Sequence, residues 1–179
     1  MRVIAGTLKG RRLKAPTWDG LRPTSDKLRE TLFNILAPVI DGARVLDGYA
    51  GTGAVGIEAL SRGAAHVTFV ERDRRAQSLI AENLASCGVA DRYAIIRAGI
   101  DRAATELAAA SFDLVLLDPP YDAAAEPILA TVATLVAANG TLVLEHARRH
   151  ATPASVGELH RTREVLSGDS ALAFYSCPP

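Results

Sequence analysis

From residue 44 onward, short apolar runs rich in β-branched residues alternate with Ala- and Leu-rich stretches of helical length. Strands that alternate with helices form βαβ units, in which consecutive strands are parallel. The expected strands are residues 44–47, 66–71, 93–97, 112–117 and 140–145. The expected helices are a first one that ends at about residue 60, then residues 73–86, 101–109 and 124–137. The pattern predicts an α/β fold with a mostly parallel sheet.

Both ends of the chain depart from this alternation. Residues 161–166 and 171–176 flank Gly168-Asp169 and predict an antiparallel hairpin. At the front, residues 3–6 and 8–13 predict a small Gly-punctuated hairpin, which we expect to lie outside the core. Thr24 is the expected N-cap of a helix that ends before Pro38. We therefore expect a basic hairpin extension over residues 1–20 and one α/β domain over residues 21–179.

Length and composition limit the class of protein. A chain of 179 residues, 49% of them hydrophobic, can form one full α/β domain with a sizeable core. Its longest apolar runs are far shorter than the roughly 20 residues of a membrane helix, and Lys9 to Lys14 is basic where a signal peptide would be apolar. Two cysteines are too few for a disulfide framework. We expect a soluble cytoplasmic monomer without a membrane partner.

Charge is unevenly distributed, although the formal net charge is zero. The first 30 residues hold eight basic and three acidic residues, whereas the rest of the chain holds twelve basic and seventeen acidic ones. Concentrated cations bind polyanions by releasing counterions from phosphates. The asymmetry fits a nucleic-acid partner, and it fits a solvated basic hairpin equally well.

The strongest local motif is a glycine turn directly after the first expected strand, within Val45-Leu-Asp-Gly-Tyr-Ala-Gly-Thr-Gly-Ala-Val-Gly56. Glycines at this point let backbone amides approach a ligand at the N-terminus of a helix. The turn also matches the Gly-x-Gly-x-x-Gly pattern of dinucleotide-binding domains, which alone is weakly specific. It predicts a nucleotide-like ligand without choosing one.

Two acidic residues beside this turn distinguish between ligands. Glu71 ends the next strand about twenty residues past the glycines, where a carboxylate can hold the ribose hydroxyls of NAD or of S-adenosylmethionine. Asp47 ends the first strand, where it would repel a pyrophosphate but attract the ammonium and sulfonium groups of S-adenosylmethionine. Together the two acids favour S-adenosylmethionine as the cofactor.

A second motif, Asp118-Pro-Pro-Tyr121, directly follows the fourth expected strand, at the edge where open α/β sheets bind ligands. The prolines stiffen the loop, so Asp118 and the Pro119 carbonyl can grip the hydrogens of an exocyclic amine and turn its lone pair toward a methyl donor. Tyr121 offers a face on which a splayed-out base can stack. The motif indicates amino-methyl transfer, although Asp-Pro-Pro alone is also an ordinary turn.

The order of these motifs resembles that of the bacterial RsmD-type methyltransferases, which methylate the N2 of a guanine in small-subunit (16S) ribosomal RNA. The matching segments are Arg22-Pro-Thr24, Arg29-Glu-Thr-Leu-Phe-Asn34, the glycine turn and Leu117-Asp-Pro-Pro-Tyr121. The segment from Arg22 to Asn34 is the most discriminating, because many amino-methyltransferases share the other motifs. The likeness spans nearly the whole chain.

The resemblance implies a Rossmann-like class I methyltransferase with a seven-stranded, mostly parallel sheet and an antiparallel C-terminal hairpin. The expected cofactor-binding residues are Thr24, Asp47, Gly48, Tyr49, Ala50, Gly51, Thr52, Gly53, Gly56, Glu71 and Arg72. The expected catalytic residues are Asp118, Pro119, Pro120 and Tyr121. The expected RNA-binding residues are Arg2, Lys9, Arg11, Arg12, Lys14 and Arg22. The implied partner is ribosomal RNA or the small-subunit particle.

Two positions depart from the family pattern. Gly48 stands where a larger apolar residue is expected, which predicts a looser turn. After the third strand the chain reads Ala98-Gly-Ile-Asp101, without an acidic residue directly at the strand end. Either Asp101 or apolar contact alone therefore holds the adenine of the cofactor.

Other functions fit parts of the sequence. Enzymes that methylate DNA adenine or a protein glutamine use a related tetrapeptide, more often with Asn first. An NAD-dependent oxidoreductase would share the glycine turn, and a non-catalytic RNA-binding module could keep the whole fold. His146 and His150 lie four residues apart without a third ligand at a useful spacing, so we expect no metal.

Overall fold

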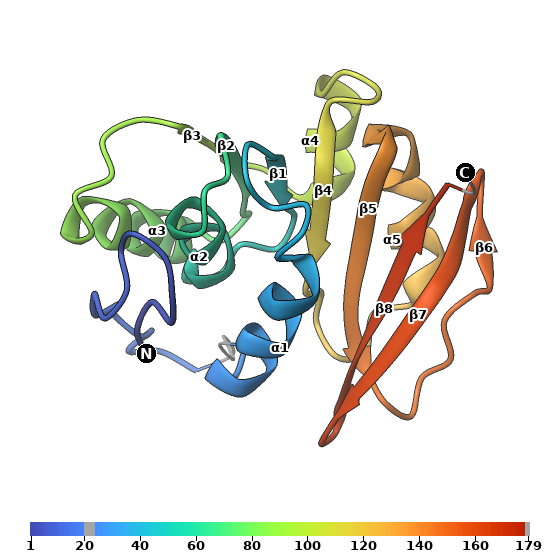
Figure 1. Cartoon of the computed structure of the whole chain (residues 1–179), viewed down its shortest axis with the longest axis horizontal. Helices are drawn as coiled ribbons and strands as arrows, with labels where there is room; N and C mark the ends of the chain where they lie inside the picture. The colour runs from blue at the N-terminus through green and yellow to red at the C-terminus, as the bar shows by residue number, and fades with distance from the viewer. Residues whose placement is uncertain (20–23, 178–179) are drawn as a thin grey trace.

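The computed structural model describes residues 1–19 and 24–177, which form a sheet with helices on both faces (Figure 1). The described strands form one eight-stranded sheet in the order β3-β2-β1-β4-β5-β8-β7-β6. The parallel strands are β1 (Arg44–Asp47), β2 (His66–Val70), β3 (Tyr93–Ile96), β4 (Phe112–Leu117) and β5 (Val136–Ala147). The antiparallel strands are β6 (Ser155–Val156), β7 (Leu159–Ser167) and β8 (Ser170–Ser176). The expected parallel sheet with a C-terminal hairpin is confirmed, and β6 adds a two-residue strand at its edge.

The helices divide between the two faces of the sheet. On the near face in Figure 1 lie α1 (Asp26–Leu36) and α2 (Ala54–Ser61), and α3 (Arg74–Ser86) packs in the same core. On the far face lie α4 (Ile100–Glu106), α5 (Ala125–Val132) and the 3₁₀ turn η1 (Ala133–Leu135). Because successive strand residues point to opposite faces, Leu114 and Leu116 enter the first core while Val115 and Leu117 enter the second.

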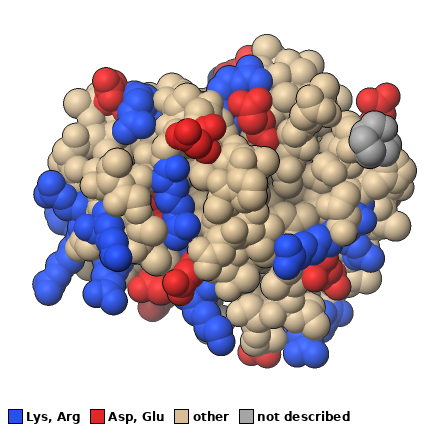
Figure 2. All heavy atoms as spheres, in the orientation of Figure 1, with Lys and Arg blue, Asp and Glu red and all other residues tan. Residues whose placement is uncertain are grey.

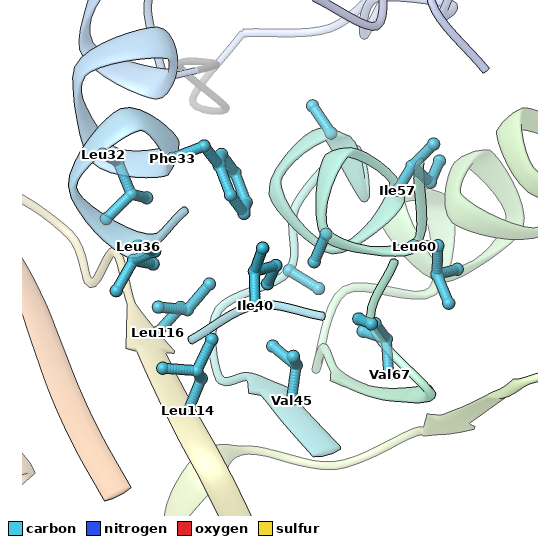
Figure 3. Close-up of a cluster of buried hydrophobic side chains, with 14 of the residues drawn as sticks. Leu32, Phe33, Leu36, Ile40, Val45, Ile57, Leu60, Val67, Leu114 and Leu116 are labelled. Atoms are coloured by element: carbon cyan, nitrogen blue, oxygen red, sulfur yellow. The ribbon is translucent and has the colours of Figure 1, made fainter. Parts of the chain in front are cut away.

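The core beneath α1 and α2 fixes the position of both helices. Leu32, Phe33 and Leu36 of α1 pack in one core with Leu114 and Leu116 of β4, and Leu36 lies close to Leu116 (Figure 3). Phe33 is fully buried. Burial of a side chain of this size stabilises the fold by about 1.5–3 kcal/mol. The start of α1 is thereby held close to the carboxyl end of β4.

The helix expected over residues 124–137 is wrong at its C-terminal end. Helix α5 stops at Val132, and β5 already begins at Val136, which pairs with Phe112 of β4. The register then jumps, so that Leu114 pairs with Thr141. A side chain at Gly140 would overlap Val136, so the glycine permits this bulge. Pairing with a central strand therefore overrides the helical preference of the alanines.

Thr24 is not the N-cap of α1. The capping residue is Ser25, whose Oγ accepts a hydrogen bond from the Leu28 amide at 3.2 Å. This arrangement leaves the Thr24 hydroxyl available to reach across to β4. The consequence for the site is described below.

The expectation that the N-terminal hairpin lies outside the core is wrong. Residues 1–15, here called the N-terminal segment, form a loop with one antiparallel bridge, Arg2 to Arg12, rather than a regular hairpin. Val3 and Leu13 are buried in the core shared with α1, α2 and α3. A side chain at Gly6 would overlap the backbone of Ser61, so the segment lies directly against the end of α2.

Buried polar groups hold the N-terminal segment in place. The Ile4 and Ala5 amides donate to the fully buried Glu58 carboxylate at 2.7 and 3.0 Å. The buried Arg29 of α1 donates to the Arg2 carbonyl at 2.6 Å. Arg29 belongs to the most discriminating part of the family-like sequence, and its contacts here are structural. The segment and α1 are thus bound to α2 by groups that would be costly to leave unpaired.

Candidate active site

A cleft opens at the carboxyl ends of β1 and β4, the adjacent strands from which the chain turns to opposite sides of the sheet. Ligands of open α/β sheets bind at such a switch point. A smaller hollow adjoins the cleft beneath α1, and the two share Thr24, Tyr49, Asp118 and Glu145. The cleft therefore brings together residues from the glycine turn, α1, β4 and β5.

The glycine turn has the conformation that its sequence predicts. Gly51 and Gly53 have φ of 54° and 78°, in the left-handed region that favours glycine, and Gly53 is the N-cap of α2. The Gly53 amide donates to the Ala50 carbonyl at 2.7 Å. This tight turn places the start of α2 at the smaller hollow, which Ala54 and Val55 line.

Gly48 and Gly56 have structural roles that differ from those expected from the sequence. The turn at Gly48 is close-packed rather than loose, because a side chain there would overlap Leu117, and the Gly48 amide donates to the Leu116 carbonyl at 2.8 Å. Gly56 lies within α2, where a side chain would overlap Phe69. Its absence of a side chain serves the packing of α2 on β2, and its amide donates to Asp47.

Asp47 is buried at the end of β1 and accepts the Gly56 amide through Oδ2 at 2.9 Å. Burial, together with smaller contributions from the nearby carboxyls of Asp118 and Glu71, raises the pKa of Asp47 to about 7 against the opposing hydrogen bond from the Gly56 amide. A carboxylate in these surroundings would be stabilised by a cationic ligand in the adjoining hollow.

Glu71 follows β2 and links the glycine turn to the next loop. Its carboxylate accepts the Gly51 amide at 2.9 Å and the Asp73 amide at 2.8 Å. Glu71 and Arg72 both line the cleft, on the same side as Asp101 at the start of α4. Burial and, to a lesser extent, the charge of Asp101 raise the pKa of Tyr49 to about 12. Tyr49 and Asp101 both line the cleft.

Asp118 is the first residue after β4, and its side chain is held from α1. The Thr24 hydroxyl donates to Asp118 Oδ2 at 3.0 Å across 94 residues of sequence. Burial raises the pKa of Asp118 to about 6, although the Thr24 hydrogen bond opposes the shift. Pro119, Pro120 and Tyr121 continue along the cleft, and the Tyr121 hydroxyl hydrogen-bonds Ser170 Oγ at 2.9 Å.

The sequence reasoning missed Glu145, which lies beside Asp118. The register pairs Leu117 with Leu144, so the two carboxyl residues follow neighbouring strand positions. Ser170 Oγ donates to Glu145 Oε1 at 3.1 Å, and burial followed by repulsion from Asp118 raises the pKa of Glu145 to about 8. The position of Glu145 in the sequence could have indicated its role. Glu145 follows the apolar run of the fifth expected strand, so it lies at the same edge of the sheet as Asp118.

The expected RNA-binding residues lie away from this cluster of carboxyls. Arg2, Lys9, Arg11, Arg12 and Lys14 are exposed on the N-terminal segment, where Figure 2 shows basic side chains gathered. Lys14 Nζ pairs with Glu82 Oε2 of α3 at 2.7 Å. Arg22 lies outside the residues that the structure describes.

Two further findings concern the residues 1–19 and 24–177. Among them, no group of three or more His, Cys, Asp or Glu side chains has the arrangement of a metal site. No helix within the same residues combines the length and the apolar character needed to span a membrane.

The raised carboxyl pKa values predict how stability depends on pH. Asp47, Asp118 and Glu145 bind protons more tightly in the folded state than in the unfolded state. The protonated carboxyls contribute fully to the free energy of unfolding below about pH 4. This contribution is lost as the pH rises through their pKa values in the folded state. We expect the ligand-free protein to melt at least about 2–4 °C lower at about pH 9 than at about pH 6, which corresponds to about 1 kcal/mol. Thermal melts at constant ionic strength test this, and a Tm that stays constant or rises would contradict it.

Known proteins resemble the chain in both sequence and structure. Residues 1–176 match the family described as Conserved hypothetical protein 95. The chain is 39% identical to Bacillus subtilis YlbH, which is named as an rRNA methyltransferase, over 98% of both chains. It is 42% identical to ribosomal RNA small subunit methyltransferase D of Haemophilus influenzae over 68% of this chain and 64% of that protein, less than two thirds of its length. A solved Escherichia coli structure described as methyltransferase YhhF superposes with a TM-score of 0.86 at 34% identity, covering 98% and 96% of the two chains.

Proposed function

The chain belongs to the RsmD-type methyltransferase family, and from this premise we propose that it methylates the exocyclic N2 of a guanine in small-subunit (16S) ribosomal RNA. One observation carries the proposal. The glycine turn after β1 and the Asp118–Tyr121 loop after β4 follow paired neighbouring strands and open into one cleft. A methyl donor held by the first motif would therefore lie next to an amine held by the second.

The cofactor is S-adenosylmethionine. When bound, it supplies an electrophilic methyl group on a positively charged sulfur. The cleft fits such a ligand because the buried Asp47 carboxyl has the Gly56 amide as its neutral partner and lies in the field of two further carboxyls. Asp47 would face the cationic amino-acid part, and Glu71 would hold the ribose hydroxyls. Tyr49 and Asp101 border the part of the cleft assigned to the adenine.

The methyl acceptor would be held by the loop after β4. The amine of guanine is a poor nucleophile, because its lone pair is delocalised into the ring. Asp118 and the Pro119 carbonyl accept the two amine hydrogens and turn the lone pair toward the methyl group. The bound cofactor would supply the methyl carbon and keep the C–S electron pair on its sulfur. Methylation of N2 would leave a surplus proton on the amine, and the Asp118 carboxylate would accept it. Tyr121 stacks on the base.

Replacing Glu71 with alanine tests the cofactor site. We expect the affinity for S-adenosylmethionine to fall by about 1–3 kcal/mol, because hydrogen bonds to a carboxylate are lost and the Gly51 amide loses its acceptor. Titration calorimetry measures the change, and Glu82→Ala in the exposed part of α3 is the matched control. Wild-type protein that binds NAD but not S-adenosylmethionine would overturn the assignment.

The exposed basic residues of the N-terminal segment are proposed to contact RNA phosphates. Changing Lys9, Arg11 and Arg12 to glutamine should weaken RNA binding and flatten its salt dependence, by about 0.7–0.9 in slope for each phosphate that is no longer neutralised. Because these side chains are exposed, the melting temperature should stay unchanged. Arg102→Gln, in the exposed part of α4, is the control. An unchanged salt slope would show that the segment serves the fold alone.

The proposed function is tested in cells. Mass spectrometry of nucleosides from small-subunit RNA should show one N2-methylguanosine that disappears when the gene is deleted and returns when it is restored. An unchanged level would contradict the proposal. Loss of N6-methyladenosine from DNA, or of methylglutamine from a protein, would point to the acceptors of the related enzymes instead.

A further inference from the structure

Glu145 is a carboxyl residue of the acceptor site that none of the motifs contains. Strands β4 and β5 lie side by side (Figure 1), and their register sets Glu145 next to Asp118 at the carboxyl edge. Both side chains line the cleft and the adjoining hollow. Glu145 therefore borders the same space as Asp118.

The Glu145 carboxyl is held by a neutral hydroxyl from another strand. Ser170 Oγ at the start of β8 donates to its Oε1 at 3.1 Å and also hydrogen-bonds the Tyr121 hydroxyl. The Thr24 hydroxyl bonds Asp118 and lies close enough to Glu145 to lower its pKa. This network connects the loop of Tyr121, the hairpin β7–β8 and the start of α1 to one pair of carboxyls.

Two neighbouring carboxyls in a partly buried setting are costly for the fold. Burial and mutual repulsion raise the pKa of Asp118 to about 6 and that of Glu145 to about 8, so near neutral pH the pair holds about one proton. Such pairs are concentrated at functional sites, where a ligand compensates for the cost. A ligand that presents two hydrogen-bond donors side by side would compensate for the cost of this carboxyl pair.

The Watson–Crick edge of guanine presents such donors, N1–H and the N2 amine, next to each other. Adenine presents an amine beside N1, which is an acceptor and would face a carboxyl oxygen without a hydrogen. A base turned into a pocket is read by hydrogen bonds to this edge. The discrimination belongs to the ionised Glu145, which can only accept hydrogen bonds. A protonated Glu145 could donate to the N1 of adenine, so the preference is measured above about pH 8.

We propose that Glu145 is a specificity-determining residue, which accepts the N1–H of the target guanine while Asp118 and the Pro119 carbonyl hold its N2 amine. This inference rests on the proposed function and names the feature by which the site distinguishes guanine from other bases that carry an exocyclic amine. Ser170 acts as a positioning residue, because its hydroxyl orients the Glu145 carboxyl.

The test uses small-subunit RNA assembled from fragments, with guanine or 2-aminopurine at the methylated position. 2-Aminopurine keeps the N2 amine, but its N1 is an acceptor. We expect the wild-type protein to prefer guanine in kcat/KM by about 100-fold or more, because an analogue lacking a bonded hydrogen leaves buried groups unpaired. In Glu145→Gln the amide can donate to the N1 of 2-aminopurine, so the preference should fall at least about tenfold.

The comparison of ratios separates recognition from structural damage. Loss of the O6 oxygen in 2-aminopurine affects both proteins alike, so the change in preference reports on N1. Ser170→Ala should lower the preference by a smaller factor, which gives a second test if Glu145→Gln folds poorly. Glu158→Gln, on an exposed turn, should keep the wild-type preference. Affinity for S-adenosylmethionine confirms that each variant is folded.

The inference and the proposed function fail in different ways. If wild-type protein forms N2-methylguanosine but Glu145→Gln and Ser170→Ala keep the wild-type preference, or lose activity on both RNAs by the same factor, the role of Glu145 is wrong and the function stands. If wild-type protein transfers no methyl group to guanine in this RNA, both are wrong.

Discussion

Replacing Asp118 with alanine is expected to lower kcat for methyl transfer by about 100-fold or more while leaving the affinity for S-adenosylmethionine nearly unchanged. In the proposed mechanism the Asp118 carboxylate holds one amine hydrogen and receives the proton that the amine loses. Removal of one such preorganised acceptor typically costs about 10²–10³-fold in rate. The cofactor site is little affected, because Asp47, Glu71 and the glycine turn are held by their own hydrogen bonds.

Single-turnover kinetics with labelled S-adenosylmethionine measures this effect, because it separates chemistry from product release. Asp118→Asn keeps an acceptor oxygen without its charge and should retain more activity than the alanine variant. Asp113→Asn is a matched control, because it lies on the same strand at the opposite edge of the sheet and pairs with exposed Arg44. Near wild-type turnover in Asp118→Ala would remove Asp118 from the mechanism.

Deletion of residues 1–15 is expected to destabilise the protein severely. The truncation removes Val3 and Leu13 from the core, and it removes the Ile4 and Ala5 amides from the buried Glu58 carboxylate. Loss of two buried apolar side chains costs about 2–5 kcal/mol each, and a buried charge that loses partners adds about 3–5 kcal/mol. The free energy of unfolding should therefore fall by more than about 5 kcal/mol.

For a chain of this size a loss of that magnitude lowers Tm by about 10–20 °C or prevents folding. Thermal melts of the truncated and full-length proteins test the expectation. The Lys9, Arg11 and Arg12 variant, which keeps the backbone and the apolar side chains of the segment, should melt like the wild type. If the truncated protein kept the wild-type Tm, the contacts with Glu58 and the core would not contribute to stability.

The sequence was sufficient to predict the features that depend on neighbouring residues. The glycine turn follows from left-handed positions directly after a strand, and the five parallel strands follow from short apolar runs between helical stretches. The parallel sheet then places the ends of β1 and β4 at one edge, so the approximate location of the cleft was also predictable. The glycine turn and the alternation of strands and helices each depend on residues close together in the sequence, and few other folds fit them.

Other features depend on contacts between distant residues and could not be predicted in this way. The Thr24–Asp118 hydrogen bond joins residues 94 apart, and the Ile4–Glu58 bond joins residues 54 apart. In the sequence Glu145 follows an apolar run, as many solvated acids do, and only the register of β5 against β4 places it beside Asp118. The charge of the basic residues in the N-terminal segment suggested a hairpin outside the core. Val3 and Leu13, which lie among these basic residues in the sequence, are buried in the core.

The central claim is tested most directly with purified protein, methyl-labelled S-adenosylmethionine, and small-subunit RNA from cells lacking the gene, supplied free or in particles. After digestion to nucleosides, the account predicts that the label appears in N2-methylguanosine, at one position, and that Asp118→Ala lowers the rate of labelling by about 100-fold or more. Label in another nucleoside or in protein, or no transfer to either form of the RNA, would contradict the account.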